Sequence, residues 1–383
     1  DIDTELLEDR SFGLQIKKKD VFKDVLPQML NGATDQLDKA RAIYAYIQKN
    51  IKKNGYIGIY SENTIKTALE RHSGNTADIN LALVAALNAA DIDAEALILS
   101  TRNNGAVNDL YPVISEFNYV VAKVNIDNKS YLLDATVPFL PFGLLPLHCI
   151  NGKGRAVPLK KPSYWHEIAA SQKQSTKYVL NAALDNEGFL KGSLTTVSSG
   201  YSALKKRERI SEAGSTDQYV EKLDEQMPAI KIGNYRVDNL DSLENPLVEV
   251  YDIEMKIFDK MGSGQFYFNP FFINRTDKNP FNLNERSYPV DLGAPIDDRL
   301  TMNITLPDNI VLANEPKNMA LALVDDGGKY QTATSLAGNN LVFHQLMQLN
   351  SPIYGPEEYL SLKEFFSRII QFQKTDIILK KTK

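Results

Sequence analysis

Apolar residues follow a helical period in the first quarter of the chain. The segment of residues 34–53 shows this period. It opens with Thr34 and Asp35, two residue types that cap helix N-termini. A shorter helix is indicated near residues 65–69, and a third spans residues 76–90. The third carries apolar side chains on nearly every side, so we expect a buried central helix.

Beyond this helix the hydrophobic period changes to two, which indicates strands. Strands are predicted at residues 94–100, 117–125 and 129–136. Asp127-Asn128 joins the last two strands and suits a two-residue hairpin turn. Helices followed by paired strands predict an α+β domain, with helices packed on an antiparallel sheet.

Residues 138–162 are rich in proline and glycine, and we interpret them as the exit from a first domain that ends at residue 165. The remainder is mainly β. A hairpin is indicated around residues 185–188, and helices are indicated at residues 201–212 and 217–226. Further strands are predicted at residues 231–237, 247–257, 265–268, 300–306, 319–324, 331–336, 341–348 and 376–380.

Short strands at regular spacing favour a β-sandwich-like region over residues 166–383, with residue 290 as a further candidate boundary. One late helix is indicated from Pro356 to Gln371, where the proline suits the first turn. The tripeptide Asn-Pro-Phe begins at both Asn269 and Asn279, and we assign no function to these copies. The fold class is therefore α+β, followed by a β-sandwich-rich C-terminal region.

Composition is that of an ordinary globular protein, with 43% apolar and 24% charged residues. The net charge of -5 and the pI of 5.6 argue against nucleic-acid partners, which require clustered Lys and Arg. The one basic run, Lys205–Arg209, is interpreted as the solvated face of a helix. No apolar stretch reaches the roughly eighteen residues of a membrane span. The chain begins at Asp1 rather than Met, so we expect that an upstream segment has been removed.

Metal and disulfide chemistry have few possible donors in this chain. Cys149 is the single cysteine, which excludes an intrachain disulfide framework and a cysteine-rich zinc site. None of the four histidines forms a helical pair of the kind that binds metals; they are His72, His148, His166 and His344. We therefore expect neither a metal nor a cofactor.

A thiol acyl-transfer site needs a cysteine at a helix N-terminus, a histidine to pair with it, and a carboxylate or amide to orient the histidine. The order of elements offers a place for each. Gly74–Asp78 opens the central helix, Phe117–Tyr119 begins one strand, and Tyr131–Thr136 lies on the next. Over residues 35–160 this pattern resembles the transglutaminase-like superfamily, which has a papain-type core.

The resemblance extends to multidomain Bacteroidetes proteins that place such a core next to large β-sandwich domains of unknown function. Ser100–Gly105 and Phe139–Pro146 fit the pattern of the core. Tyr288–Asp291 and Ile378–Lys381 resemble the β domain of those proteins. The resemblance implies a periplasmic or otherwise extracytoplasmic setting.

The same resemblance implies where catalytic residues belong, and two of the three are replaced. The cysteine position maps to Thr76, the histidine to Tyr119 and the aspartate to Asp134. An internal threonine with no Lys or His nearby in sequence is better suited to cap a helix than to attack a carbonyl. Tyrosine, with an ordinary pKa near 10, is a poor base at neutral pH. We therefore expect a vestigial triad and no catalytic residue.

Cys149 and His148 are the other residues that could supply thiol chemistry. Adjacent side chains in an extended chain point to opposite faces, so they are poorly placed to form a catalytic pair. Cys149 is interpreted as a buried thiol. Ser73 beside His72 lacks the strand–turn–helix context of a hydrolase serine. None of these residues replaces the missing thiol and imidazole.

Two classes of function follow. The first is a non-catalytic transglutaminase-like protein that binds or scaffolds a protein, a peptide or a glycan. The alternative is a hydrolase or acyltransferase of the cysteine-protease and transglutaminase superfamily that uses an unrecognised nucleophile. A third reading, in which the domain only spaces β domains, requires no concave pocket. The ligand and the oligomeric state are not set by the sequence.

The predicted hairpin turn fixes the strand register around the vestigial site. If Asp127-Asn128 is a two-residue turn, Tyr119 lies opposite Thr136 and diagonal to Asp134 on the same face. We therefore expect the Tyr119 hydroxyl to donate a hydrogen bond to the Asp134 carboxylate. Thr76 is expected beside this pair, at the start of the central helix.

Overall fold

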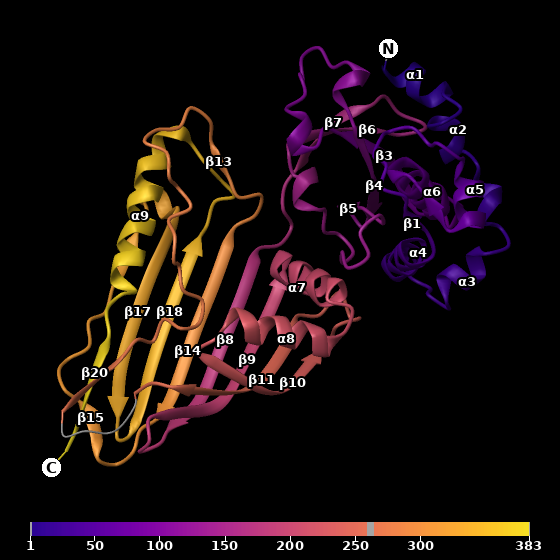
Figure 1. Cartoon of the computed structure of the whole chain (residues 1–383). Helices are drawn as coiled ribbons and strands as arrows, with labels where there is room; N and C mark the ends of the chain where they lie inside the picture. The colour runs from indigo at the N-terminus through magenta and orange to yellow at the C-terminus, as the bar shows by residue number, and fades with distance from the viewer. Residues whose placement is uncertain (1, 259–263, 383) are drawn as a thin grey trace. The chain divides into compact units, whose positions relative to one another are not determined.

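The structure, a computed structural model, describes residues 2–258 and 264–382 (Figure 1). The chain forms two compact units, residues 1–171 and 172–383. Each unit has a hydrophobic core of its own, so each is described by itself. The division falls after residue 165 because strand β7 (Tyr164–Ile168) still belongs to the sheet of the first unit.

Helices in the first half of the N-terminal unit pack around one central helix. The predicted helices are present as α4 (Gln36–Asn50) and α5 (Ile65–Arg71). Three further α-helices precede them and were not predicted, because segments of four to seven residues are too short to show a period. They are α1 (Ile2–Glu8), α2 (Gly13–Ile16) and α3 (Leu26–Leu30).

The central helix, α6 (Thr76–Ala89), is confirmed as a buried element, and residues 76–87 are all buried. Its start is fixed by a capping box, in which two residues bond each other's backbone. The Asp78 amide donates to the side chain of Asn75 at 2.8 Å, and the Asn75 amide donates to the side chain of Asp78 at 2.9 Å.

The sheet of the first unit has the strand order β5-β4-β3-β6-β7, and every neighbouring pair is antiparallel. Its strands are β3 (Asp93–Leu99), β4 (Tyr119–Ile126), β5 (Lys129–Leu133), β6 (Gly152–Val157) and β7. Asp127 and Asn128 both have positive φ, at 48° and 62°, as a tight turn between β4 and β5 requires. Ala122 pairs with Leu133, which confirms the predicted register.

Strand β6 lies within residues 138–162 and β7 follows them, so these residues are part of the first unit's sheet as well as its exit. Polar and apolar residues do not alternate along β6, so the sequence shows no strand signal there. Its residues are selected instead by contacts with neighbouring strands. A Cβ atom on Gly154 would lie 2.4 Å from Cδ2 of Leu97 on β3, so glycine is needed where the strands meet. A two-residue parallel pair, β1 (Lys52–Lys53) with β2 (Ser73–Gly74), stands beside the start of α6.

An eight-stranded sheet dominates the second unit, in the order β10-β11-β9-β8-β14-β18-β17-β16. It is antiparallel except where β14 pairs parallel with β8. The bounds are β8 (Gln174–Leu184), β9 (Phe189–Gly200), β10 (Ile230–Asp238), β11 (Leu247–Lys256), β14 (Ile296–Thr305), β16 (Ala320–Ala322), β17 (Gly328–Ala337) and β18 (Asn340–Leu349). Strands from both sides of residue 290 share this sheet.

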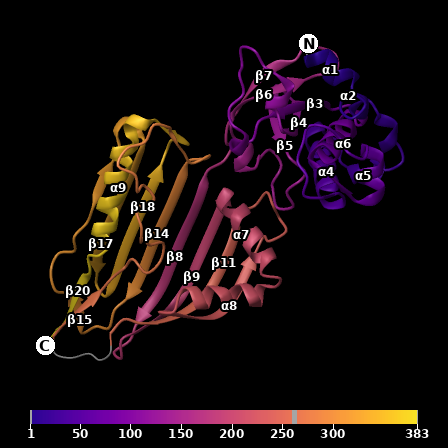
Figure 2. The ribbon, with the colours of Figure 1, turned by 45° about the horizontal axis from the view of Figure 1, so that its top comes forward.

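Helices and a smaller sheet supply the second layer of this unit (Figure 2). The helices α7 (Tyr201–Glu212), α8 (Thr216–Gln226) and α9 (Tyr359–Phe372) correspond to predicted helices. The smaller sheet has the order β12-β20-β15, with β12 (Gln265–Phe268), β15 (Ile310–Leu312) and β20 (Ile377–Lys381). A short pair, β13 (Val290–Asp291) with β19 (Ile353–Tyr354), precedes α9.

The basic run on α7 is only partly solvated, which corrects its interpretation as a solvated face. Arg207 is 1% exposed, and its guanidinium donates to backbone carbonyls of the loop 239–245. Lys206 forms an ion pair with the buried Glu249 at 3.0 Å. A buried guanidinium that fixes a loop cannot be distinguished in sequence from an exposed one.

Candidate functional site

Thr76, which the sequence resemblance maps to a nucleophile position, opens α6 and is fully buried. Its hydroxyl donates to the backbone carbonyl of Tyr56 at 3.3 Å, and its amide reaches the same carbonyl. The loop that carries Tyr56 therefore covers the threonine. A hydroxyl that is buried and already donating to a carbonyl is not positioned to attack a substrate.

Tyr119 begins β4 and is also fully buried. Its hydroxyl donates to Oδ2 of Asp134 at 2.8 Å and lies 3.0 Å from Oγ1 of Thr136. These contacts confirm the hydrogen bond that the register predicted. Burial, followed by the nearby charge of Asp134, raises the pKa of Tyr119 far above its ordinary value. Tyr119 therefore keeps its proton at every physiological pH.

Asp134 lies at the centre of a buried hydrogen-bond network. Oδ1 accepts from the side-chain amide of Asn80 at 3.0 Å and from the Thr136 backbone amide at 3.0 Å. The side chain of Asn80 also bonds the backbone at Val120 and Ala135. Asn80 on α6 therefore anchors the aspartate to the central helix. The sequence signal of Asn80 is an amide side chain inside a mostly apolar helix, whose other asparagine, Asn88, lies near the C-terminal end.

The three mapped positions are thus not joined in one network. Tyr119 and Asp134 bond each other directly, as expected. Thr76 bonds the loop at Tyr56 instead, and the contact between α6 and Asp134 is made one turn later by Asn80.

Two residues that we did not assign to the site lie against Tyr119. The His148 ring packs edge-on to the Tyr119 ring, with 5.3 Å between centroids, and Nζ of Lys53 lies 5.7 Å from the same ring. Burial lowers the pKa of His148, and the charge of Lys53 lowers it further, against an opposing effect of Asp134. The imidazole is therefore neutral at pH 7. From the sequence we considered His148 only as a partner of Cys149 and did not consider Lys53, because both residues lie far from β4 in sequence.

Cys149 follows His148 but is fully buried. It packs with Tyr119, Leu145 and Ile150 in a cluster on one face of the sheet. Burial raises the pKa of this thiol well above its ordinary value, so the reactive thiolate is disfavoured. His148 and Cys149 lie on a short 3-10 helix, Leu147–Cys149, rather than in the extended chain that we expected from the sequence, and both pack against Tyr119.

A cleft of about 220 Å³ opens beside Tyr119 and His148. It is lined by Ile57, Thr101, Asn103, Asn104, Asn118, Tyr119 and His148. Asn118 is engaged within the fold, because it accepts from the Thr101 amide and donates to the Thr101 hydroxyl. Among the residues that the structure describes, the His148 ring and the Asn103 side chain in this lining form no hydrogen bond. These groups are available to a ligand.

The described residues contain no group of three or more His, Cys, Asp or Glu side chains that could hold a metal ion. Within residues 2–258 and 264–382 no helix is long and apolar enough to cross a membrane.

Family comparisons match two parts of the chain. Residues 23–133 match the model of the transglutaminase-like superfamily. Residues 264–379 match a domain of unknown function with a solved structure, DUF3858. No curated protein matches the sequence.

Among solved structures, the chain is similar to the crystal structure of a "putative protease" from Parabacteroides distasonis, with a TM-score of 0.55 and 15% identity. The match covers 98% of this chain and 57% of that chain, so this chain spans little more than half of its relative. At this identity the likeness is one of fold. A second match, to baculovirus P35, has a TM-score of 0.13 and 8% identity over 54% of this chain and 96% of that chain, and carries no argument.

Proposed function

We propose that this chain, which carries a transglutaminase-like core and a strand-rich C-terminal region, binds a ligand in the cleft beside Tyr119 without catalysing a reaction there. The observation that carries the proposal is the state of Thr76. At the place where this superfamily needs an exposed nucleophile, the chain has a buried hydroxyl that donates to the Tyr56 carbonyl.

The partner positions support the same proposal. Where a histidine would take a proton, Tyr119 donates one to Asp134. The carboxylate that would orient the histidine is instead satisfied by Tyr119, Asn80 and the Thr136 amide. Two positions of the vestigial triad, Tyr119 and Asp134, thus belong to a structural network, and Thr76 is bonded separately to the loop at Tyr56. The ligands that the cleft could bind are a protein, a peptide or a glycan. A periplasmic setting, implied by resemblance, remains part of the proposal.

A hydrolase with another nucleophile is the second candidate, and His148 is the observation that favours it. A neutral imidazole at the cleft, with no hydrogen-bond partner among the described residues, has the chemistry of a general base. The adjacent thiol cannot serve as its nucleophile while Cys149 is buried. This candidate therefore requires a water molecule or a substrate group as the attacking species.

A broad peptide library, assayed for both binding and cleavage, separates the two candidates. We expect wild-type protein to retain some peptides, to cleave none, and to lose retention in Ile57→Asp, which places a charge on the cleft wall. Lys129→Ala, at an exposed hairpin position, is the matched control. Turnover that is abolished by Thr76→Ala or by His148→Ala would overturn the non-catalytic proposal.

A further inference from the structure

The large sheet of the second unit has one face that the hydrophobic core does not use. Along β11, Leu247, Tyr251 and Ile253 are buried in core clusters, whereas Asp252 points away and is exposed. Paired residues of neighbouring strands lie on the same face of a sheet, and Asp252 pairs with Ser193, so Ser193 on β9 also faces away from the core. We call the face that carries Asp252 the outer face.

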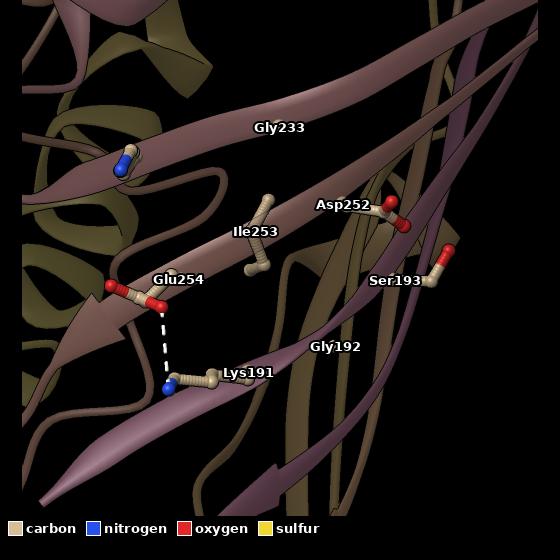
Figure 3. A pocket seen from close by; sticks show the side chains of 8 residues that line it. Lys191, Gly192, Ser193, Gly233, Asp252, Ile253 and Glu254 are labelled. Atoms are coloured by element: carbon tan, nitrogen blue, oxygen red, sulfur yellow. Dashed lines mark ion pairs between the residues drawn. The ribbon is translucent and has the colours of Figure 1, made fainter.

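The outer face is hollowed between β9, β10 and β11, in a pocket of about 610 Å³ (Figure 3). Two features of β10 make the hollow. Gly233 has no side chain, and the register shifts between Ile232 and Tyr235. A Cβ atom on Gly233 would lie 3.3 Å from Cβ of Asp252, so a larger side chain there would fill the space.

Charges around the hollow are balanced. Lys191 and Glu254 form a cross-strand ion pair at 3.4 Å (Figure 3). Lys231 and Asp252 supply one further charge of each sign. A site with two ammonium groups and two carboxylates attracts neither a polyanion, such as nucleic acid, nor a cation. Charge complementarity therefore favours a neutral, polar ligand.

The wall that contains Asp252 continues as a row of polar side chains across four strands. Asp252 pairs with Ser193, Ser193 with Asn181, and Asn181 with Asn303. The amide of Asn303 donates to Oδ1 of Asn181 at 2.9 Å, and the amide of Asn234 donates to Oδ2 of Asp252 at 2.7 Å. These bonds fix the side chains and leave Oδ1 of Asp252 able to accept.

Free hydrogen-bonding capacity repeats along this row at the strand spacing of about 4.8 Å. In this row the Ser193 hydroxyl forms no hydrogen bond with any described residue. Lys231 lies beside the row, on β10 opposite Glu254, and its ammonium also forms no hydrogen bond or ion pair with a described residue. A ligand that crosses the strands therefore meets a donor or acceptor at each step. A chain of hydroxyl-bearing rings has this periodic chemistry, whereas a flat apolar ligand does not.

Residue types in the hollow argue against a protein as its occupant. Protein interfaces concentrate aromatic residues, Met and Arg at their centres. None of the residues that line this pocket is of those types. We propose that the outer face binds a neutral oligosaccharide chain, which crosses the strands along the row that Asp252 begins. This site lies in the second unit and does not depend on the function proposed for the first.

Affinity electrophoresis of the whole chain tests the site, in gels that contain xylan, mannan, mixed-linkage β-glucan or starch, with the anionic polygalacturonate as a comparison. We expect retardation in at least one neutral gel. Titration calorimetry with the matching oligosaccharide should show affinity about tenfold lower in Asp252→Ala, the loss expected for one hydrogen bond to a charged acceptor. Gly233→Leu, which fills the hollow, should bind at least as weakly.

Gln331→Val is the matched control, because Gln331 is an exposed position on β17 far along the same sheet and should leave affinity unchanged. Circular dichroism and thermal unfolding check that each variant folds, and Ser193→Val replaces Gly233→Leu if the latter does not. Four outcomes overturn the proposal: no retardation in any neutral gel, retardation by polygalacturonate alone, unchanged affinity in folded Asp252→Ala and pocket-filling variants, or a photoreactive residue at position 193 that cross-links to a protein instead of the sugar.

Discussion

The Tyr119 hydroxyl is a donor in a buried network, and its removal tests that role. Tyr119→Phe leaves Oδ2 of Asp134 without its 2.8 Å donor while keeping the ring that packs beside His148. We expect a loss on the order of 1 kcal/mol in the free energy of unfolding, measured by urea denaturation, with an unchanged m-value.

Tyr131→Phe is the control for this change. Tyr131 is a half-buried tyrosine of the same hairpin whose hydroxyl bonds no described residue, and its ring packs on Phe142. We expect it to cost less than Tyr119→Phe. Equal costs would show that the hydroxyl of Tyr119 contributes nothing specific, and a catalytic rate that fell only in Tyr119→Phe would contradict the structural role.

Cys149 is expected to resist thiol reagents in the folded state. Its side chain is fully buried, and the raised pKa lowers the fraction of thiolate. Labelling with a chromogenic disulfide should be slow in native protein and fast in urea. Fast labelling of the native protein would reopen the question of a thiol enzyme.

Asp298 gives stability an unusual pH dependence. Burial raises the pKa of its carboxyl to about 6 from the ordinary 3.8. Between those values the folded state holds more protons than the unfolded state, so this group makes the free energy of unfolding fall as pH rises from about 4 to about 6. Asp297 acts oppositely and at lower pH, because its hydrogen bonds with Arg299 lower its pKa.

Asp298→Asn should remove that slope and keep the bond from the Thr176 amide, which an asparagine oxygen can also accept. We expect a gain of about 1–3 kcal/mol at pH 7 and little change at pH 4, from denaturation curves across this range. Asp308→Asn, at an exposed carboxylate, should leave the free energy of unfolding unchanged at both pH 7 and pH 4. A stability profile of Asp298→Asn parallel to wild type would contradict the assignment.

At the scale of elements, the two Asn-Pro-Phe copies have a shared structural role that the sequence did not reveal. In each copy the asparagine oxygen accepts from the phenylalanine amide at 2.9 Å. In each copy the asparagine amide also donates to a backbone carbonyl on or just after α9, Asn269 to Gln373 and Asn279 to Lys363. The two copies thus hold the segment 269–281 along the helix.

Asn279→Asp separates the two functions of this side chain. An aspartate keeps the oxygen that accepts from Phe281 but loses the amide that donates to Lys363 and Ser367. We expect a loss of about 1 kcal/mol and faster hydrogen exchange of the amides of α9. Asn186→Asp, at an exposed turn, is the matched control, and equal exchange in both variants would contradict the role.

Elements with strong local signals could be predicted, and those defined by their neighbours could not. The turn at Asp127-Asn128 fixed the register of its hairpin, and the apolar run of α6 marked a buried helix. Strand β6 carries no alternation, because Gly154 is selected by contact with Leu97. The site shows the same division. Tyr119 and Asp134 follow from hairpin parity, whereas His148 meets Tyr119 only through the fold of a long loop.

At the scale of the whole molecule, the chain separates into two units with independent cores. The core of the first is built around α6 and its sheet, and the cores of the second use the eight-stranded sheet, α9 and the smaller sheet. Strand register alone could not show which strands share a sheet, because β14 pairs parallel with β8 across more than a hundred residues of chain. Such distant pairing leaves no local signal.

The division predicts that residues 172–383 fold when expressed without the first unit. All eight strands of the large sheet, both strands of the short β13–β19 pair and the three strands of the smaller sheet lie within these residues, so no strand pairing among the described residues is lost. We expect residues 172–383 to unfold in one cooperative urea transition. Their circular dichroism should show the strand content that this unit has in the whole chain. A shorter piece that begins at residue 186 removes β8 from the centre of the sheet and should fail to fold, because β9 and β14 would lose the strand between them. If residues 172–383 unfolded without a cooperative transition, the second unit would depend on the first, and the two cores would not be independent.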